Sequence, residues 1–322
     1  MARNGQSTSH ILMIRPVNFS FNKETAVNNA FQVAGSEAGA QEAALREFED
    51  FVMLLEKEGV DVTVVNDTPY PYTPDSIFPN NWVSFHDDGT VCLYPMFAAN
   101  RRLERKPSVF EQITGQFEIT NKIDLSGYEN QDSFLEGTGS MVLDREAKIA
   151  YACLSPRTDL AVLEKFCALM HYRPVTFHAV DNKGRAVYHT NVMMCVGDKF
   201  VVIALESIPD QAEKEQVIAA IQQTGKELVE ISIAQMNEFA GNMLMLQNDK
   251  DEKLLVMSGR AYASLHKDQV DRLSKWCRII HSPLNTIETN GGGSARCMIA
   301  EIHLPLKSSF ISTRASSKET GA

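Results

Sequence analysis

The chain has 322 residues, of which 44% are hydrophobic, and a formal net charge of −10 at pH 7. This acidic balance excludes the clustered Lys and Arg of a nucleic-acid or anionic-membrane surface, and no apolar run reaches the ~18 residues of a membrane span. The first residues have no signal-peptide pattern, so we expect a cytoplasmic protein.

The predicted elements, in chain order, alternate between short strands and amphipathic helices. Residues 10–19 (HILMIRPVNF) indicate a strand, and residues 41–59 have apolar side chains at helical spacing that end at Gly59. Further helices are expected in 159–170, 209–225 and 261–277, and short strands follow the four helices at 61–66, 173–180, 227–233 and 278–284.

A second pattern recurs along the chain. A short stretch of small polar residues leads onto an apolar strand, and a polar turn and a second strand follow. The segments begin at Phe78, Leu135, Tyr188, Phe239 and Gly291, about 50 to 57 residues apart. This repeat predicts an α/β ring of five blades with pseudo-fivefold symmetry; a general α/β domain with accidental periodicity stays open.

The repeat also sets the expected domain organisation. We expect a single catalytic domain over residues 10–306, with a flexible N-terminus at 1–9 and a flexible polar tail at 307–322.

The small polar starts of the segments would meet at one end of the ring. They bring a thiol, an imidazole and a carboxylate together, which are the side chains of cysteine nucleophilic catalysis. Each residue alone is typical of a core or a surface position, and only their common place in the repeat favours a site. The converging residues are Asn80, Asn81, Glu136, His189, Asn191, Asn242 and Cys297.

Several motifs resemble the pentein, or guanidine-modifying, superfamily of arginine deiminases, amidinotransferases and dimethylarginine dimethylaminohydrolases. They are PDSIF at 74–78, LEGTGS at 135–140, LSPRT at 154–158 and the order Glu136, His189, Cys297. The resemblance implies a five-bladed α/β propeller. It also implies that Cys297 is the nucleophile, that His189 is the general acid and base, and that Glu136 holds the planar group under attack.

The same resemblance implies how a small-molecule substrate is held. Asp75 would bind its α-amino group, and Arg157 with Arg102, or its neighbour Arg101, would bind its α-carboxylate. No metal or organic cofactor is implied. The six cysteines have no CxxC or zinc-ligand spacing, and whether the chain forms a homodimer is left open.

Two positions depart from the members that bind a cation. Asn81 and Asn191 are amides where those members carry acids. A buried cation needs a carboxylate partner, whereas an amide offers a neutral ureido group both a donor and an acceptor. We therefore predict that Asn80, Asn81 and Asn191 bind the ureido group of citrulline, which is hydrolysed to ornithine, CO₂ and ammonia.

Four alternatives stay open. They are an arginine deiminase, a dimethylarginine dimethylaminohydrolase, an amidinotransferase and a non-catalytic amino-acid-binding protein. If the amides select a ureido group, carboxylates at both positions should shift the preference towards arginine.

Overall fold

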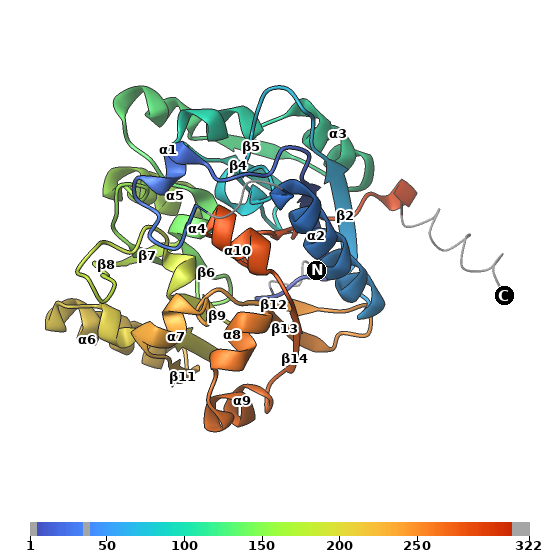
Figure 1. Ribbon diagram of the computed structural model, residues 1–322. Helices are drawn as coiled ribbons and strands as arrows, with labels where there is room; N and C mark the ends of the chain where they lie inside the picture. Colours follow the sequence, from blue (N-terminus) through green and yellow to red (C-terminus); the bar gives the residue numbers. More distant parts are fainter. Residues whose placement is uncertain (1–4, 35–38, 311–322) are drawn as a thin grey trace.

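The computed structural model describes residues 5–34 and 39–310, and it contains five three-stranded sheets (Figure 1). The first consists of β1 (His10–Arg15), β2 (Asp61–Asn66) and β15 (Ala300–Glu301), and the second of β3 (Val83–Phe85), β4 (Thr90–Leu93) and β5 (Asn121–Asp124). The third consists of β6 (Val142–Asp144), β7 (Ile149–Cys153) and β8 (Arg173–Phe177). The fourth consists of β9 (Met194–Val196), β10 (Phe200–Ile203) and β11 (Glu227–Glu230), and the fifth of β12 (Leu244–Gln247), β13 (Lys253–Ser258) and β14 (Arg278–Ser282).

All five sheets follow one plan. The middle strand pairs antiparallel with one neighbour and parallel with the other, and one or two helices make the parallel crossover. In the first sheet β15 takes the antiparallel place, with Glu301 opposite Ile11, so distant parts of the chain close one sheet. The crossover helices are α2 (Ala40–Lys57), α3 (Pro107–Gln116), α5 (Leu160–Met170), α6 (Gln211–Gln223), and the pair α8 (Gly259–Ser264) and α9 (Lys267–Leu273).

Shorter elements complete the chain. The α-helical turns are α1 (Lys23–Ala26), α4 (Gly137–Ser140), α7 (Ile233–Asn237) and α10 (Asn285–Gly291). The 3₁₀ turns are η1 (Pro79–Asn81), η2 (Ala99–Glu104), η3 (Ser126–Gln131), η4 (Thr190–Val192) and η5 (Leu205–Ser207). In Figure 1, α3, α6 and α9 lie on the outside of the molecule, while α10 lies near the centre of the view.

The middle strands of the sheets are buried on both faces because each face packs into a different core. In β1, Ile11 and Met13 join the cluster shared with the fifth sheet, while Leu12 and Ile14 join the cluster shared with the second. This is the two-residue alternation of a strand buried on both sides. Together the clusters connect each sheet to the next and the fifth to the first.

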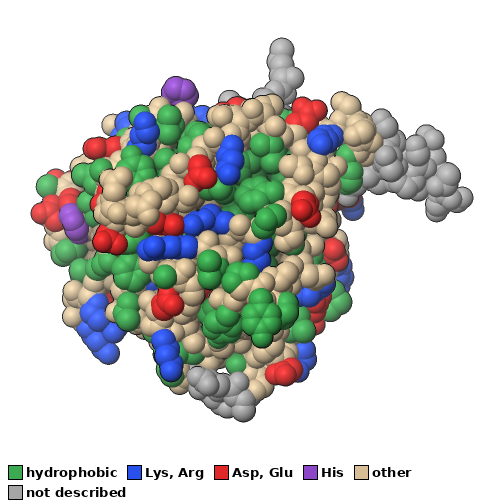
Figure 2. Space-filling view, turned by 90° about the horizontal axis from the view of Figure 1, so that it is seen from above, with side chains coloured by type: hydrophobic (Ala, Val, Ile, Leu, Met, Phe, Trp, Pro, Cys, Tyr) green, Lys and Arg blue, Asp and Glu red, His purple; other side chains and the backbone are tan. Residues whose placement is uncertain are grey.

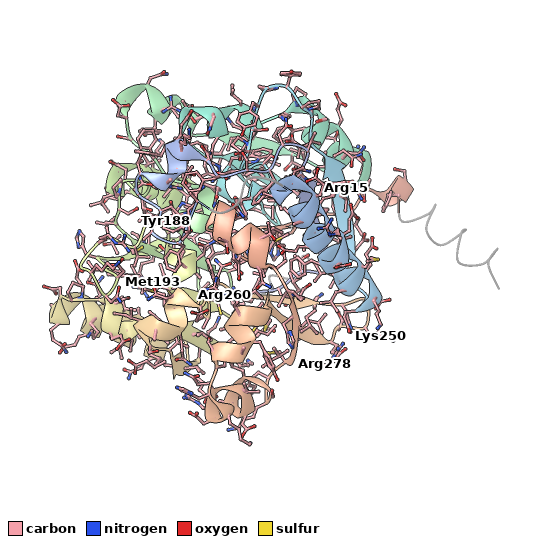
Figure 3. All side chains as sticks on the ribbon, viewed as in Figure 1. Arg15, Tyr188, Met193, Lys250, Arg260 and Arg278 are labelled. Atoms are coloured by element: carbon pink, nitrogen blue, oxygen red, sulfur yellow. The ribbon has the colours of Figure 1, made fainter. Side chains whose placement is uncertain are left out.

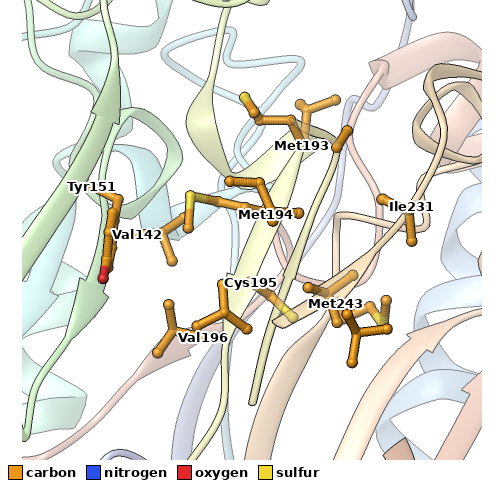
Figure 4. Close-up of a cluster of buried hydrophobic side chains, with 14 of the residues drawn as sticks. Val142, Tyr151, Met193, Met194, Cys195, Val196, Ile231 and Met243 are labelled. Carbon is orange, nitrogen blue, oxygen red and sulfur yellow. The ribbon is translucent and has the colours of Figure 1, made fainter. Parts of the chain in front are cut away.

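The largest of these clusters spans the third, fourth and fifth sheets. Figure 4 shows Val142 and Tyr151 facing Met194, with Met243 beyond Cys195. Flexible methionine side chains fill irregular gaps between strands, which explains why strand β9 and its surroundings are rich in methionine.

The predicted helices and strands are found, but several strands end earlier than expected and one helix is divided. The stretch 261–277, expected as one helical segment, is divided between α8 and α9. The backbone of Leu265 is extended, at φ −71° and ψ 138°. The His266 N–H then donates to the side chain of Gln269 at 2.8 Å, which starts the second helix.

Residues 6–8, which belong to the predicted flexible N-terminus, are buried in the structure. Gln6 is buried and its side chain donates to the carbonyls of Leu143 and Val196, at 2.8 and 3.2 Å. Thr8 is buried as well and donates to the carbonyl of Ile302. Polar side chains bind backbone here because the ends of several sheets leave unpaired carbonyls. Residues 1–4, and 311–322 of the predicted tail, lie outside the described residues.

The surface carries no dominant charge on the side seen in Figure 2, where apolar, basic and acidic side chains are interspersed. Within the described residues, no helix has both the length and the apolar character needed to cross a membrane.

Candidate active site

The polar starts of the five repeated segments meet at one site. Asn80 and Asn81 lie in η1, Glu136 directly precedes α4, and His189 directly precedes η4. The short turns η1 and η4 both contact α4, which brings these side chains together. Two further residues come from the last two segments: Asn242 just before β12 and Cys297 just before β15.

Glycine allows this close approach of backbones. A Cβ at Gly137, whose φ is +47°, would lie 2.4 Å from the carbonyl oxygen of Asn80. A Cβ at Gly139 would lie 2.3 Å from Asn81 Nδ2 and 2.8 Å from His189 Nδ1. The glycines of the LEGTGS segment therefore let the Asn81 amide and the His189 imidazole approach each other at Gly139.

Glu136 and His189 form a buried hydrogen-bonded pair. Glu136 Oε2 lies 2.8 Å from His189 Nε2, and Oε1 accepts the Phe97 N–H at 2.9 Å. Burial alone would raise the pKa of the Glu136 carboxyl, but Arg157 and His189 together hold it well below its usual range. An ionised carboxylate can only accept, so Nε2 of His189 carries its proton and Nδ1 keeps the lone pair.

The environment keeps this imidazole neutral. Burial lowers the pKa of His189 to about 4, against the opposing effect of the Glu136 carboxylate. At neutral pH, His189 can therefore accept a proton at Nδ1, and Glu136 stabilises the imidazolium that results.

Cys297 is the only sulfur among the residues that line this cavity in the described structure. It follows α10 and the glycine run, in which Gly292 has a φ of +63°. The side-chain amides of Asn191 and Asn242 donate hydrogen bonds to its Sγ, with Nδ2–Sγ distances of 3.4 and 3.3 Å. The thiol is thus within reach of two amide donors, and Cys297 and His189 line the same cavity.

Arg101 determines how the Asn81 amide is turned. Its Nη1 donates to Asn81 Oδ1 at 2.7 Å, and Nε and Nη2 bind the two carboxylate oxygens of Glu104 at 2.8 and 3.0 Å. A guanidinium only donates, so the oxygen of Asn81 must face Arg101. The opposite Nδ2 is buried and has no protein partner.

Asp75 and Arg157 also line the cavity. Asp75 Oδ2 accepts from Asn22 and Thr25, whereas Oδ1 is buried without a partner. Arg157 donates to Asn28 and Thr25 and reaches Glu136 Oε2 at 3.4 Å. Its guanidinium lies 5.0 Å from the centre of the Tyr188 ring, a side chain labelled in Figure 3.

The segment around α1 closes this cavity, whose volume is about 10 Å³. A larger pocket of about 380 Å³ lies on the outer side of residues 26–32 and shares Asn29 and Tyr188 with it. A cavity of this volume has room for about one water.

The structure brings most of the predicted site residues together. Cys297, His189, Asn81, Asp75 and Arg157 line the cavity. Glu136 contacts His189 and Arg157, and Asn191 contacts Cys297. Asn80 is fully buried beside α4, and neither polar atom of its side chain has a partner.

Arg102 lies elsewhere, and its neighbour Arg101 lines the cavity. Arg102 donates to the carbonyls of Met96 and Phe97 and does not line the cavity. Adjacent residues on a 3₁₀ turn point in different directions, so NRRLE alone does not tell the two arginines apart. The predicted site also missed Asn22, Thr25 and Asn28; their polar run before a helix is an unspecific signal.

No metal centre is evident in the described ranges, where no group of three or more His, Cys, Asp and Glu side chains is arranged to hold an ion.

Comparison with known proteins places the chain in a family. The family model described as "N,N dimethylarginine dimethylhydrolase, eukaryotic" matches residues 15–304, and the chain belongs to this family. It is thus a member of the pentein superfamily and an enzyme of a class of hydrolases that act on guanidino groups. Among curated proteins, none matches the sequence.

Solved structures share the fold at low sequence identity. The N-terminal domain of ArgZ, a cyanobacterial arginine dihydrolase, is 17% identical with a TM-score of 0.73, over 92% of this chain and 98% of that one. AgrE in complex with L-arginine is 16% identical with a TM-score of 0.73, over 93% of this chain and 41% of that one. The dimethylarginine hydrolase of Pseudomonas aeruginosa, solved with citrulline, is 14% identical with a TM-score of 0.61, over 92% and 100%.

Proposed function

We propose that this enzyme hydrolyses the ureido group of citrulline to ornithine, CO₂ and ammonia through a covalent Cys297 intermediate. The proposed catalytic domain comprises residues 10–306 together with the buried residues 6–8. Its five sheets are the blades of a propeller with pseudo-fivefold symmetry, and the site lies at one end of the axis. The clusters that connect each sheet to the next support this arrangement.

The observation that carries the ureido proposal is the orientation of Asn81. Arg101 holds its oxygen, so only the Nδ2 donor remains for a ligand. A ureido group presents a carbonyl oxygen to such a donor. A guanidinium presents only N–H groups, so the Asn81 Nδ2 donor and the guanidinium N–H that faces it would both stay unpaired.

The charges at the cavity support the same substrate. Two arginines and one aspartate line it, Arg101, Arg157 and Asp75. The nearby Glu136 carboxylate is already bound by Arg157 and His189. If Asp75 binds the α-ammonium group of the substrate, no uncommitted carboxylate among these residues remains for a cationic head. Burying an unpaired charge is costly.

The proposed reaction begins at the thiol. Sγ of Cys297 attacks the ureido carbon while Nδ1 of His189 takes the thiol proton, and Glu136 stabilises the imidazolium. Nδ2 of Asn81 donates to the oxygen that becomes negative. Loss of one such donor typically lowers kcat by ~10²–10³-fold.

The intermediate then breaks down in two steps. The bond from the carbon to the δ-nitrogen breaks, His189 returns the proton to that nitrogen, and ornithine leaves a carbamoyl group on sulfur. His189 next takes a proton from water, which attacks the carbamoyl carbon, and the thiol is regenerated. The released carbamate decomposes to CO₂ and ammonia, so one water is consumed for each citrulline.

The amino-acid end of the substrate would be held by the remaining charges. The unpartnered Oδ1 of Asp75 suits the α-ammonium group. Arg157 can exchange its bonds to Asn28 and Thr25 for the α-carboxylate when segment 22–32 opens, since a planar guanidinium binds carboxylates through paired bonds.

The test is product analysis of the purified protein with L-citrulline, L-arginine and dimethylarginine in parallel. We expect ornithine and ammonia in equal amounts from citrulline, with activity abolished in Cys297→Ala and thermal stability retained. Release of citrulline from arginine or dimethylarginine, with citrulline itself inert, would contradict the ureido proposal.

A second candidate is hydrolysis of a guanidinium. The ionised Glu136 carboxylate near the cavity favours it, because that group can pair with a cation once Arg157 withdraws. The same assay separates the two candidates by their products.

A further inference from the structure

Asn242 places an amide N–H against the sulfur of Cys297, from a segment far away in the sequence. Its Nδ2 lies 3.3 Å from Sγ, and the residue is completely buried. Asn191 makes the other amide contact, at 3.4 Å. The sulfur therefore receives two side-chain donors inside the protein.

The amide of Asn242 cannot turn around. Its Oδ1 accepts the backbone N–H of Arg296 at 3.0 Å, and this N–H can only donate. The other N–H of Nδ2 donates to the carbonyl of Asn191 at 2.9 Å. Backbone groups thus occupy the Oδ1 acceptor and one of the two N–H donors of Asn242, so the second N–H must point at the sulfur.

The backbone that carries Asn242 is also held in place. A Cβ at Gly241 would lie 2.3 Å from the carbonyl oxygen of Val192 and 2.6 Å from the Met193 carbonyl carbon. The segment before Asn242 thus lies directly on the turn that carries Asn191. Backbone contact and hydrogen bonds together leave the amide little freedom.

We propose that Asn242 is a catalytic residue that stabilises the thiolate form of Cys297 and aims its sulfur at the substrate. An N–H donor binds a thiolate more strongly than a thiol, because hydrogen bonds to a charged acceptor are the stronger ones. The inference rests on the proposed role of Cys297 as nucleophile and does not depend on whether the substrate is a ureido or a guanidinium compound.

The two asparagines have different parts in this arrangement. Asn242 uses all its polar groups on the protein and the sulfur. Asn191 has a buried Oδ1 without a partner, so its oxygen remains available to a substrate N–H. Asn242 thus acts on the nucleophile alone, and Asn191 also acts on the substrate.

The test measures alkylation of Cys297 by iodoacetamide as a function of pH, read by mass spectrometry of the peptide that contains it. The variants are Asn242→Ala, which removes the donor, and Asn242→Asp, which keeps the acceptor for Arg296 but replaces the donor by an anion. Asn248→Ala is the matched control, because it removes another buried asparagine of the β12–β13 hairpin. Thermal unfolding of each variant reports the fold.

We expect the alkylation rate at pH 7 to fall at least ten-fold in both Asn242 variants and to stay unchanged in Asn248→Ala. The pH of half-maximal rate should rise, and the plateau at high pH should remain. A purely structural role would change the plateau without moving the midpoint, and an unmoved midpoint in both Asn242 variants would overturn the proposal.

The outcome is separable from the substrate proposal. If arginine and not citrulline is hydrolysed, a raised alkylation midpoint still supports Asn242. If Cys297→Ala keeps full activity, the nucleophile assignment fails and the catalytic role of Asn242 fails with it.

Discussion

At the residue scale, the site depends on the missing side chain of Gly139. Asn81 Nδ2 and His189 Nδ1 both approach the place where a Cβ would lie. The proposed oxyanion donor and the proposed base are therefore close together only because this position is glycine. The φ angle of Gly139 is not positive, so glycine is required here by lack of space for a Cβ and not by the backbone conformation.

We expect Gly139→Ala to lower kcat/KM for citrulline by about 100-fold or more, because misplacing a reacting group by ~1 Å can cost that much. Gly127→Ala is the control, since a Cβ there meets nothing within 4 Å. Steady-state kinetics together with circular dichroism checks the effect. Normal activity of folded Gly139→Ala would contradict the close approach.

At the element scale, the β3–β4 hairpin buries a histidine in its turn. The His86 N–H donates to the Thr90 carbonyl at 2.9 Å, and its Nε2 lies 2.8 Å from the Ser84 hydroxyl. Burial lowers the pKa of His86 well below its usual value, the Arg145 charge adds to this, and Glu301 opposes it. The hairpin is therefore stable with a neutral imidazole.

This pKa shift predicts how stability depends on pH. Because the unfolded chain binds a proton at His86 near pH 6.5 and the folded protein does not, this contribution is present above pH 6.5 and is lost as the pH falls. Between pH 7 and pH 5 it amounts to about 2 kcal/mol of unfolding free energy.

Urea unfolding at both pH values measures this contribution. The loss of stability from pH 7 to pH 5 should be about 2 kcal/mol smaller in His86→Gln, which cannot titrate, than in the unaltered protein. The exposed His281 provides the control variant His281→Gln. Equal pH dependence in His86→Gln and the unaltered protein would show that His86 is not held neutral.

At the scale of the whole molecule, the described start of the chain connects different sheets. Gln6 donates to carbonyls at the ends of β6 and β9 and accepts the Arg145 N–H at 2.7 Å. Thr8 binds the segment after β15, and its carbonyl accepts from Gln247 at the end of β12. Residues 6–8 thus join the third, fourth, fifth and first sheets.

We expect Gln6→Ala to lower the free energy of unfolding by about 2–4 kcal/mol, since three buried hydrogen bonds of about 1 kcal/mol each are lost. Denaturant unfolding of the full chain measures it, with Gln222→Ala on the exposed face of α6 as the control. A stability equal to that of the control would mean that this segment contributes nothing.

The sequence by itself determined the elements and their repetition. The apolar run of β1 and the helical spacing of α2, which ends at Lys57 shortly before Gly59, depend on residues close together in the chain. Glu136, His189 and Cys297 each lie near the polar start of a repeated segment. This was enough to predict that the three side chains meet, because the starts of repeated units lie at the same end of a ring.

Only the tertiary structure decided the details on which the chemistry depends. The choice of Arg101 over Arg102, the turned amide of Asn81 and the forced donor of Asn242 each come from a partner in another segment. The buried place of Gln6 is set by carbonyls more than 130 residues away. Spacing in the sequence indicates which elements form, but the direction of a hydrogen bond follows from the backbone and side chains that folding brings beside it.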